Sequence, residues 1–210
     1  TLRVFGSALR VGKPFWERPV SVFDASMNIG LRSAFVMSKF VAPHMVENKS
    51  GLMVQVSSFG GHGYLFDVGY GVGKAGLDRL SADMAAELTT HGVSSVTLYP
   101  GGAVTETTNF PGGETPTFAG RAVAALLMRT SSEDLSLING KVTFTMELAL
   151  KNGFKDSSGK LPDGPVSSEE AAAGMRAALG NTPFQYNLDA PMPDPNETNS
   201  KEAAGSVSYT

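Results

Sequence analysis

The amino-acid sequence predicts an α/β fold in which helices flank a parallel β-sheet. Stretches with helical periodicity alternate with short strand-like runs along the first half of the chain. Such an alternation favours parallel strands joined by right-handed crossovers through the helices. With 210 residues, of which 41% are hydrophobic, the chain can bury one sizeable core, so we expect one domain followed by a tail.

The expected elements between residues 22 and 99 form a helix–strand–helix–strand series. We expect a helix over residues 22–47, a strand over 51–57, a helix over 68–91 and a strand over 93–99. The second helix has the strongest periodicity, with apolar residues every three or four positions at Leu77, Leu80, Met84 and Leu88. The segments that follow the two strands should meet at one edge of the sheet, where parallel sheets bind their ligands.

The second half of the chain is less regular. Residues 105–117 are rich in glycine, proline and threonine and predict a loop. Helices are expected over residues 118–129 and 169–179. From Asn181 onward the chain has too few large apolar residues to form a core, so we expect disorder there.

Composition argues against several classes of function. The 17 basic and 20 acidic residues give a net charge of -3 and no basic stripe, so no nucleic-acid partner is expected. No apolar run approaches the ~18 residues of a membrane-spanning helix. Without cysteine there are no disulfides or thiolate metal sites, and no two histidines have metal-ligand spacing, so no metal is expected. The compartment stays open, with the cytoplasm as the default expectation.

The segment from Val54 to Lys74, VQVSSFGGHGYLFDVGYGVGK, carries the residues best suited to chemistry. Tyr70 and Lys74 lie one helical turn apart on one face of the expected helix. A free phenol titrates near ~10, so a tyrosine that exchanges protons near neutral pH needs a positive charge beside it, which Lys74 can supply. A hydroxyl from Ser57 or Ser58 can hydrogen-bond the same substrate oxygen. The alternative is a helix without chemistry, because tyrosine and lysine often occur four residues apart.

Two other motifs are weaker. A serine hydrolase would use Ser57 or Ser58 as its nucleophile, but the chain has no G-x-S-x-G elbow. The G-x-G-x-x-G at residues 71–76 is followed by a strand candidate that ends in Tyr99 rather than in an acidic residue, so it does not predict a dinucleotide-binding turn.

The Ser-Ser and Tyr-x-x-x-Lys pattern resembles the active-site segment of the short-chain dehydrogenase/reductase superfamily. Its members move a hydride between a nicotinamide cofactor and an alcohol or carbonyl. Three further segments match in the same order, namely Asn28 in FDASMNIGL, the run Pro100-Gly101-Gly102-Ala103-Val104-Thr105, and Gly140-Lys141-Val142. The resemblance implies a Rossmann-like parallel sheet with flanking helices, NADP or NAD as cofactor, and a small-molecule carbonyl or alcohol as substrate.

The resemblance also implies roles for the matching residues. Tyr70 acts as the general acid/base, while Lys74 lowers the pKa of Tyr70 and binds the nicotinamide ribose. Asn28 holds a water in the proton relay. The cofactor is also contacted by the segment after the second strand, through Pro100, Gly101 and Thr105, with Thr105 at the nicotinamide carboxamide.

The resemblance leaves the catalytic serine open between two neighbours. The spacing to the tyrosine that is common in the superfamily points to Ser57. The local match, with a loop one residue shorter, points to Ser58. Ser58 is the preferred catalytic serine and Ser57 is the alternative.

The chain departs from the family pattern at its N-terminal end. The family holds the adenine and pyrophosphate with a glycine-rich turn after its first strand, and no such turn precedes the helix that carries Asn28. We expect residues 1–160 to form the C-terminal part of a Rossmann-type domain without its N-terminal strands, and residues 161–210 to form a short helix and a disordered tail. The sequence is therefore expected to be incomplete and inactive alone. The alternative function is a truncated, inactive homologue that acts as an oligomerising or interaction protein through its two long helices.

Overall fold

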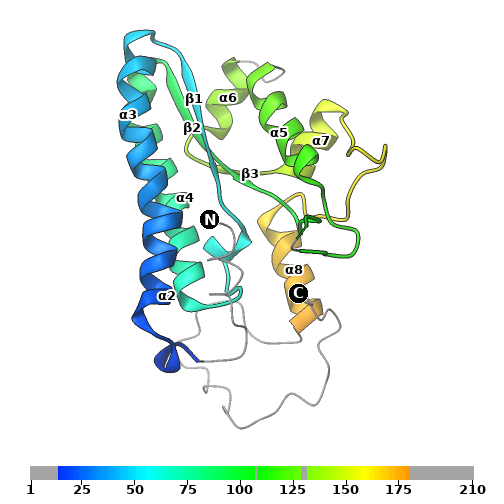
Figure 1. The fold of residues 1–210 in the computed structure, drawn as a ribbon. Helices are drawn as coiled ribbons and strands as arrows, with labels where there is room; N and C mark the ends of the chain where they lie inside the picture. Colours follow the sequence, from blue (N-terminus) through cyan, green and yellow to red (C-terminus); the bar gives the residue numbers. More distant parts are fainter. Residues whose placement is uncertain (1–13, 107, 129–131, 180–210) are drawn as a thin grey trace.

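Helices cover both faces of a three-stranded parallel sheet (Figure 1). The computed structural model describes residues 14–106, 108–128 and 132–179. The strands lie in the order β1-β2-β3, with β1 at Gly51–Val56, β2 at Val93–Tyr99 and β3 at Val142–Phe144. The α/β class predicted from the sequence is confirmed, whereas the tail expected from Asn181 lies outside the described residues.

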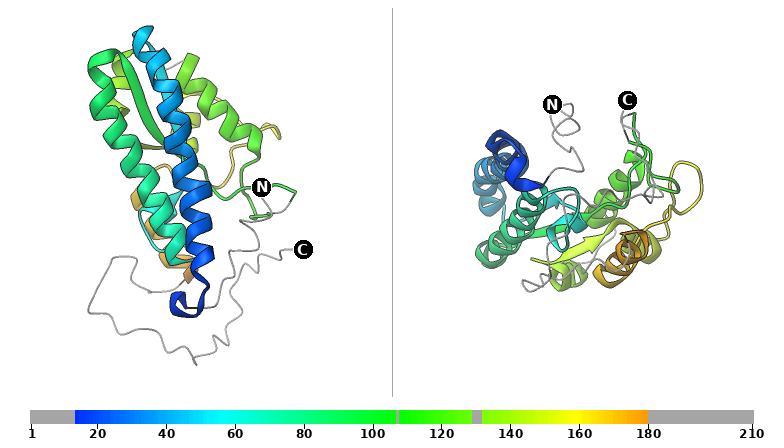
Figure 2. Two further views of the ribbon diagram at one scale, coloured as in Figure 1. Left: turned by 60° about the vertical axis from the view of Figure 1, so that its left-hand side comes forward. Right: turned by 90° about the horizontal axis from the view of Figure 1, so that it is seen from below.

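Two long helical rods lie side by side on one face of the sheet (Figures 1 and 2). The first consists of α2 (Val20–Ala25), a π-helical segment (Ser26–Arg32) and α3 (Ser33–Glu47). The second is α4 (Val68–Leu88), which ends in a 3-10 turn at Thr89–His91. Both correspond to helices expected from the sequence, but the π-helical segment was not predicted.

Shorter helices cover the other face and the lower end of the sheet (Figure 1). They are α5 (Pro116–Met128), α6 (Ser132–Ile138), α7 (Thr145–Asn152) and α8 (Ser168–Leu179). Ala171 of α8 packs with Phe59, Tyr99 and Phe144, which places α8 near the ends of the strands. The sequence predicted α5 and α8, but not α6 or α7.

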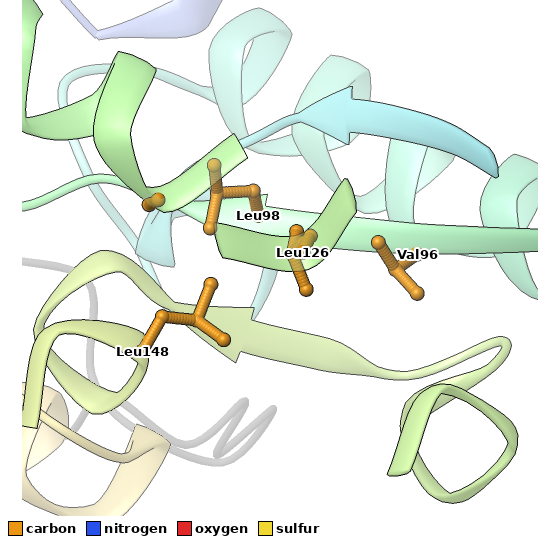
Figure 3. Packing of buried hydrophobic residues seen from close by; sticks show 5 residues of the cluster. Val96, Leu98, Leu126 and Leu148 are labelled. Carbon is orange, nitrogen blue, oxygen red and sulfur yellow. The ribbon is translucent and has the colours of Figure 1, made fainter. Parts of the chain in front are cut away.

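The largest buried cluster lies between β2 and the helices α5 and α7 (Figure 3). Its members are Val96, Leu98, Ala122, Leu126 and Leu148. On the opposite face of β2, Ser95 is also buried, and its hydroxyl lies 3.0 Å from that of Ser81 on α4. Ser95 faces α4 because side chains alternate between the two faces of a strand. The small residues at this contact let α4 pack closely against the sheet.

The register brings the C-terminal ends of β1 and β2 together. β1 pairs with β2 from Gly51 opposite Val93 to Val56 opposite Leu98. The backbone N–H of Ser57 then donates to the carbonyl of Leu98 at 3.0 Å. The segments that follow the two strands therefore leave the sheet at the same edge.

Within the described ranges, no helix combines the length and apolar character needed to cross a membrane.

Candidate active site

The first turn of α4 is held in place by Asp67, the residue that caps it. The Asp67 carboxylate accepts a hydrogen bond from the backbone N–H of Tyr70 at 2.8 Å, which satisfies one of the free donors at the start of the helix. Its other oxygen pairs with Arg18 at 3.1 Å, and both side chains are largely buried. This cap therefore fixes where Tyr70 emerges from the helix.

Tyr70 and Ser58 meet at the edge of the sheet. Ser58 Oγ lies 2.8 Å from Tyr70 Oη, and it also accepts a hydrogen bond from the backbone N–H of Gly60 at 3.2 Å. A Cβ at Gly60 would lie only 2.5 Å from Cε1 of Tyr70, so glycine there allows the ring to approach. Phe66 packs edge-on against the same ring with centroids 5.1 Å apart. The position of the phenol is thus set from several sides.

The ammonium group of Lys74 lies beside the same ring. Lys74 Nζ is 5.7 Å from the centroid of the Tyr70 ring and donates to the carbonyl of Val56 at 3.3 Å. Burial lowers the pKa of Lys74, and the carboxylate of Asp78 partly opposes this by raising it. The site therefore combines a phenol, a hydroxyl and an amine near one point.

The two candidate serines face different partners. Ser57 is buried, and its hydroxyl donates to the backbone carbonyl of Lys74 at 3.2 Å. Ser58 instead has its hydroxyl at the phenol of Tyr70. Because a group that shares a substrate oxygen with the phenol must reach its hydroxyl, this geometry favours Ser58 over Ser57.

Asn28 lies on the neighbouring rod, in the π-helical segment Ser26–Arg32. This segment packs against α4, where a Cβ at Gly73 would lie 3.3 Å from Cε of Met27. The Asn28 side chain is exposed, and it takes no part in the hydrogen bonds that join Ser58 to Tyr70 and Lys74 to Val56. Short π-helical segments often occur at functional sites, which is consistent with a role at this position.

The segment from Pro100 to Thr105 follows β2 and is bonded to the loop after it. The hydroxyl of Thr105 lies 2.8 Å from that of Thr108 and accepts the Thr108 N–H at 3.1 Å. The backbone of Glu114 donates to Gly102 and accepts from Val104, both at 2.8 Å. The expected cofactor segment therefore has a defined shape at the same edge as Ser58.

Sequence reasoning missed Glu114, whose side chain holds the segment from Pro100 to Thr105 in place. Its side chain is buried, and one carboxylate oxygen accepts from the Gly101 N–H at 3.1 Å and from the Thr145 hydroxyl at 2.6 Å. Its other oxygen is buried without a hydrogen-bond partner among the described residues. Burial raises the pKa of Glu114. No sequence signal links Glu114 to Gly101 or Thr145, because only the fold brings them together.

Glu114→Ala should lower the free energy of unfolding by about 1–3 kcal/mol, because it leaves the partly buried Gly101 N–H and the buried Thr145 hydroxyl without an acceptor. Glu114→Gln keeps an acceptor oxygen and should lose less. The two variants can be compared with the wild type by urea unfolding.

The raised pKa of Glu114 adds a pH dependence. Between the ordinary glutamate pKa and the raised one, the folded state binds more protons than the unfolded state, so stability falls as pH rises through that window. Glu114→Gln should lose this fall. An identical pH dependence in the wild type and Glu114→Gln would contradict the assignment.

A second missed group lies behind Lys74. Asp78 follows Lys74 by one helical turn, and the hydroxyl of Tyr99 donates to Asp78 Oδ2 at 2.5 Å. Burial raises the pKa of Asp78, and the hydrogen bond from Tyr99 and the proximity of the Ser57 hydroxyl oppose this. The four-residue spacing of Lys74 and Asp78 was visible in the sequence, but the contribution of Tyr99 was not.

Gly61 packs directly against the carboxyl of Asp78 and the hydroxyl of Tyr99. A Cβ at Gly61 would collide with Asp78 Oδ2 and would lie 3.0 Å from Tyr99 Oη. Gly61→Ala should therefore lower the free energy of unfolding by about 1–3 kcal/mol, as measured by urea unfolding. Gly120→Ala is the matched control, because Gly120 is exposed in α5 with open space around its Cα, and alanine there should stabilise the helix by about 0.5–1 kcal/mol. Equal effects of the two changes would contradict the packing described.

The described residues contain no group of three or more histidine, aspartate or glutamate side chains placed to hold a metal ion.

Comparison with known proteins points to one family. The family model described as short chain dehydrogenase matches residues 4–111. Dehydrogenase/reductase SDR family member 1 of Mus musculus and that of Homo sapiens are each 39% identical to this chain, over 70% of this chain and 53% of theirs. Carbonyl reductase (NADPH) 2 of Sus scrofa is 35% identical over 47% of this chain and 41% of its own length.

Solved structures show the same fold. A structure of 4-hydroxyisoleucine dehydrogenase complexed with NADH superposes with a TM-score of 0.55 at 20% identity, over 64% of this chain and 62% of that one. The chain spans about half the length of the mouse and human SDR family member 1 proteins, because it covers 53% of each.

Proposed function

The chain belongs to the short-chain dehydrogenase family, and on that premise we propose that its site transfers a hydride between NAD(H) or NADP(H) and an alcohol or carbonyl substrate. The observation that carries the proposal is the distance of 2.8 Å between Ser58 Oγ and Tyr70 Oη, with Lys74 beside the same ring. This arrangement lets two hydroxyls reach one substrate oxygen while a neighbouring cation favours the ionised phenol.

Each residue has a distinct part in the proposed reaction. When a carbonyl is reduced, Tyr70 donates its phenolic proton to the oxygen as negative charge develops there, and it accepts the proton back in alcohol oxidation. Ser58 hydrogen-bonds the same oxygen and orients it toward the phenol. Lys74 stabilises the ionised phenol, and Asn28 holds the water that returns the proton. The role of Ser57 is to bond the backbone of α4.

The residues present fit the nicotinamide end of the cofactor. A bound reduced nicotinamide supplies the hydride in this chemistry. Lys74 would hold the ribose hydroxyls, and Pro100, Gly101 and Thr105 would line the carboxamide. The fit rests on the position of Lys74 and of the segment after β2 at the C-terminal edge of the sheet, where parallel sheets bind nucleotides. NADH in one structural neighbour and NADPH in the name of one relative support a nicotinamide cofactor and leave both forms open.

A second proposal concerns self-association through the two long rods. Phe35, Met37 and Phe40 on α3 are large apolar side chains that are more than half exposed. Exposed apolar groups on one helix are typical of an association surface. They favour a homo-oligomer, and they are also what an inactive, interacting homologue would need. The two readings differ in whether hydride transfer occurs.

Hydride transfer can be measured with the full-length protein, NADH or NADPH and a panel of aldehydes and ketones. We expect the nicotinamide absorbance to fall with at least one carbonyl and no cleavage of a fluorogenic ester. Ester cleavage that is abolished by Ser58→Ala, without any change in nicotinamide absorbance, would favour a serine hydrolase. No reaction with either substrate class would favour the inactive homologue.

A further inference from the structure

Three polar side chains lie close together near Lys74, and the proposed reaction gives them no electrostatic role. This Asp78 cluster consists of Asp78, Tyr99 and Ser57. The Tyr99 hydroxyl donates to Asp78 Oδ2 at 2.5 Å, and Ser57, whose hydroxyl donates to the carbonyl of Lys74, also lies beside this carboxyl. Asp78 Oδ1 is buried and has no hydrogen-bond partner in the described part of the chain.

The unpartnered oxygen requires an explanation. Buried polar atoms in folded proteins are nearly always hydrogen-bonded, and one that is not destabilises the fold. A carboxyl whose task was only to join β2 to α4 would be served as well by a neutral amide. An ionised carboxylate differs from an amide in that it also acts electrostatically on Lys74, one helical turn before it on α4.

The charged and titratable groups that face Asp78 come from three elements. Lys74 precedes it on α4, Tyr99 ends β2, and His62 follows the turn after β1. Tyr70 acts electrostatically on Tyr99. Lys74 lies one helical turn before Asp78 on the same face of α4, and its Nζ donates to the carbonyl of Val56, at the strand end that leads to Ser58. Burial lowers the pKa of Lys74, and the negative charge of Asp78 raises it. Without its proton, Lys74 would no longer place a positive charge beside the phenol of Tyr70.

We propose that Asp78 is a positioning residue that keeps Lys74 protonated, and that Tyr99 holds the Asp78 carboxylate in place for this purpose. The inference deepens the proposed function and rests on it for its catalytic meaning. The electrostatic coupling between the two side chains is a property of the fold that can be measured without turnover.

The test follows the titration of Lys74 by NMR in protein made with isotope-labelled lysine, with its signal assigned from Lys74→Met. Asp78→Asn keeps the size of the side chain and an acceptor for Tyr99 but removes the charge. In this variant the midpoint of the Lys74 titration should move to lower pH. The matched control is Asp83→Asn, which removes an exposed carboxylate from the same helix. Its effect on Lys74 should be far smaller, because solvent and salt screen that charge.

The proposal is overturned if the Lys74 midpoint in Asp78→Asn equals that of the wild type or of Asp83→Asn. Should Asp78→Asn fail to fold, the same coupling can be read from the other partner. Lys74 lowers the pKa of Asp78, so Lys74→Met should raise the titration midpoint of the Asp78 carboxyl. Coupling between two sites is reciprocal, so an unchanged Asp78 midpoint overturns the proposal equally.

Turnover supplies a readout that a structural role would not move. As pH rises above neutral, turnover by full-length Asp78→Asn should fall at a lower pH than turnover by the wild type. In that alkaline range the turnover of the variant should be about tenfold lower than that of the wild type, whereas at neutral pH the two should be nearly equal. Asp83→Asn should follow the wild type. If the wild type shows no hydride transfer, the proposed function fails, while the Lys74 titration still decides whether Asp78 holds the proton.

Discussion

Tyr70→Phe should lower turnover of the full-length protein by about 10²- to 10⁴-fold while cofactor binding stays nearly unchanged. The variant removes only the hydroxyl that lies 2.8 Å from Ser58, and the ring can keep its edge-on contact with Phe66. Proton transfer should therefore fail without a loss of packing. Turnover is measured from nicotinamide absorbance, and cofactor affinity from the fluorescence of the bound reduced cofactor.

Tyr64→Phe is the matched control for this change. Tyr64 lies in the loop before α4 and is 62% exposed, so loss of its hydroxyl should leave turnover within about twofold of the wild type. If Tyr70→Phe retained turnover close to that of Tyr64→Phe, Tyr70 would not be the proton donor.

Ser58→Ala and Ser57→Ala should separate the two neighbouring serines. Loss of the Ser58 hydroxyl should lower kcat by about 10²- to 10³-fold, as expected for one hydrogen bond to the reacting oxygen. The Ser57 hydroxyl bonds the backbone of α4, so its loss should act mainly on stability, by about 0.5–1.5 kcal/mol. Steady-state kinetics and urea unfolding of both variants provide the comparison.

The opposite ranking would reverse the assignment. If Ser57→Ala lost more turnover than Ser58→Ala at equal stability, the spacing common in the family would identify the catalytic serine correctly, and the contact between Ser58 and Tyr70 would have another purpose.

Much of the fold could be predicted because the spacing of apolar residues along each strand and helix is a local property of the sequence. The strands at Gly51–Val56 and Val93–Tyr99 and the helix that carries Tyr70 and Lys74 have apolar patterns that indicate their type within a few residues. Parallel pairing then follows from the alternation of helix and strand, and it brings the two strand ends to one edge. The main part of the candidate site follows from these two steps.

The parts that were missed depend on contacts between distant residues. The π-helical segment Ser26–Arg32 has the same apolar pattern as an α-helix, so periodicity does not distinguish them. Asp78 and Tyr99 are 21 residues apart, and Glu114 and Thr145 are 31 apart, so neither pair forms a local pattern. Counting residues also could not separate Ser57 from Ser58, because the choice depends on which hydroxyl faces the phenol.

The central claim is that Tyr70, Ser58 and Lys74 assist the transfer of a hydride to a carbonyl. Its most direct test is mass spectrometry of the product formed by the full-length protein from a carbonyl and a reduced nicotinamide cofactor that carries deuterium at its transferable position. We predict an alcohol with one deuterium on the former carbonyl carbon, and almost none with Tyr70→Phe. Product without deuterium, or equal labelling by Tyr70→Phe, would contradict the claim.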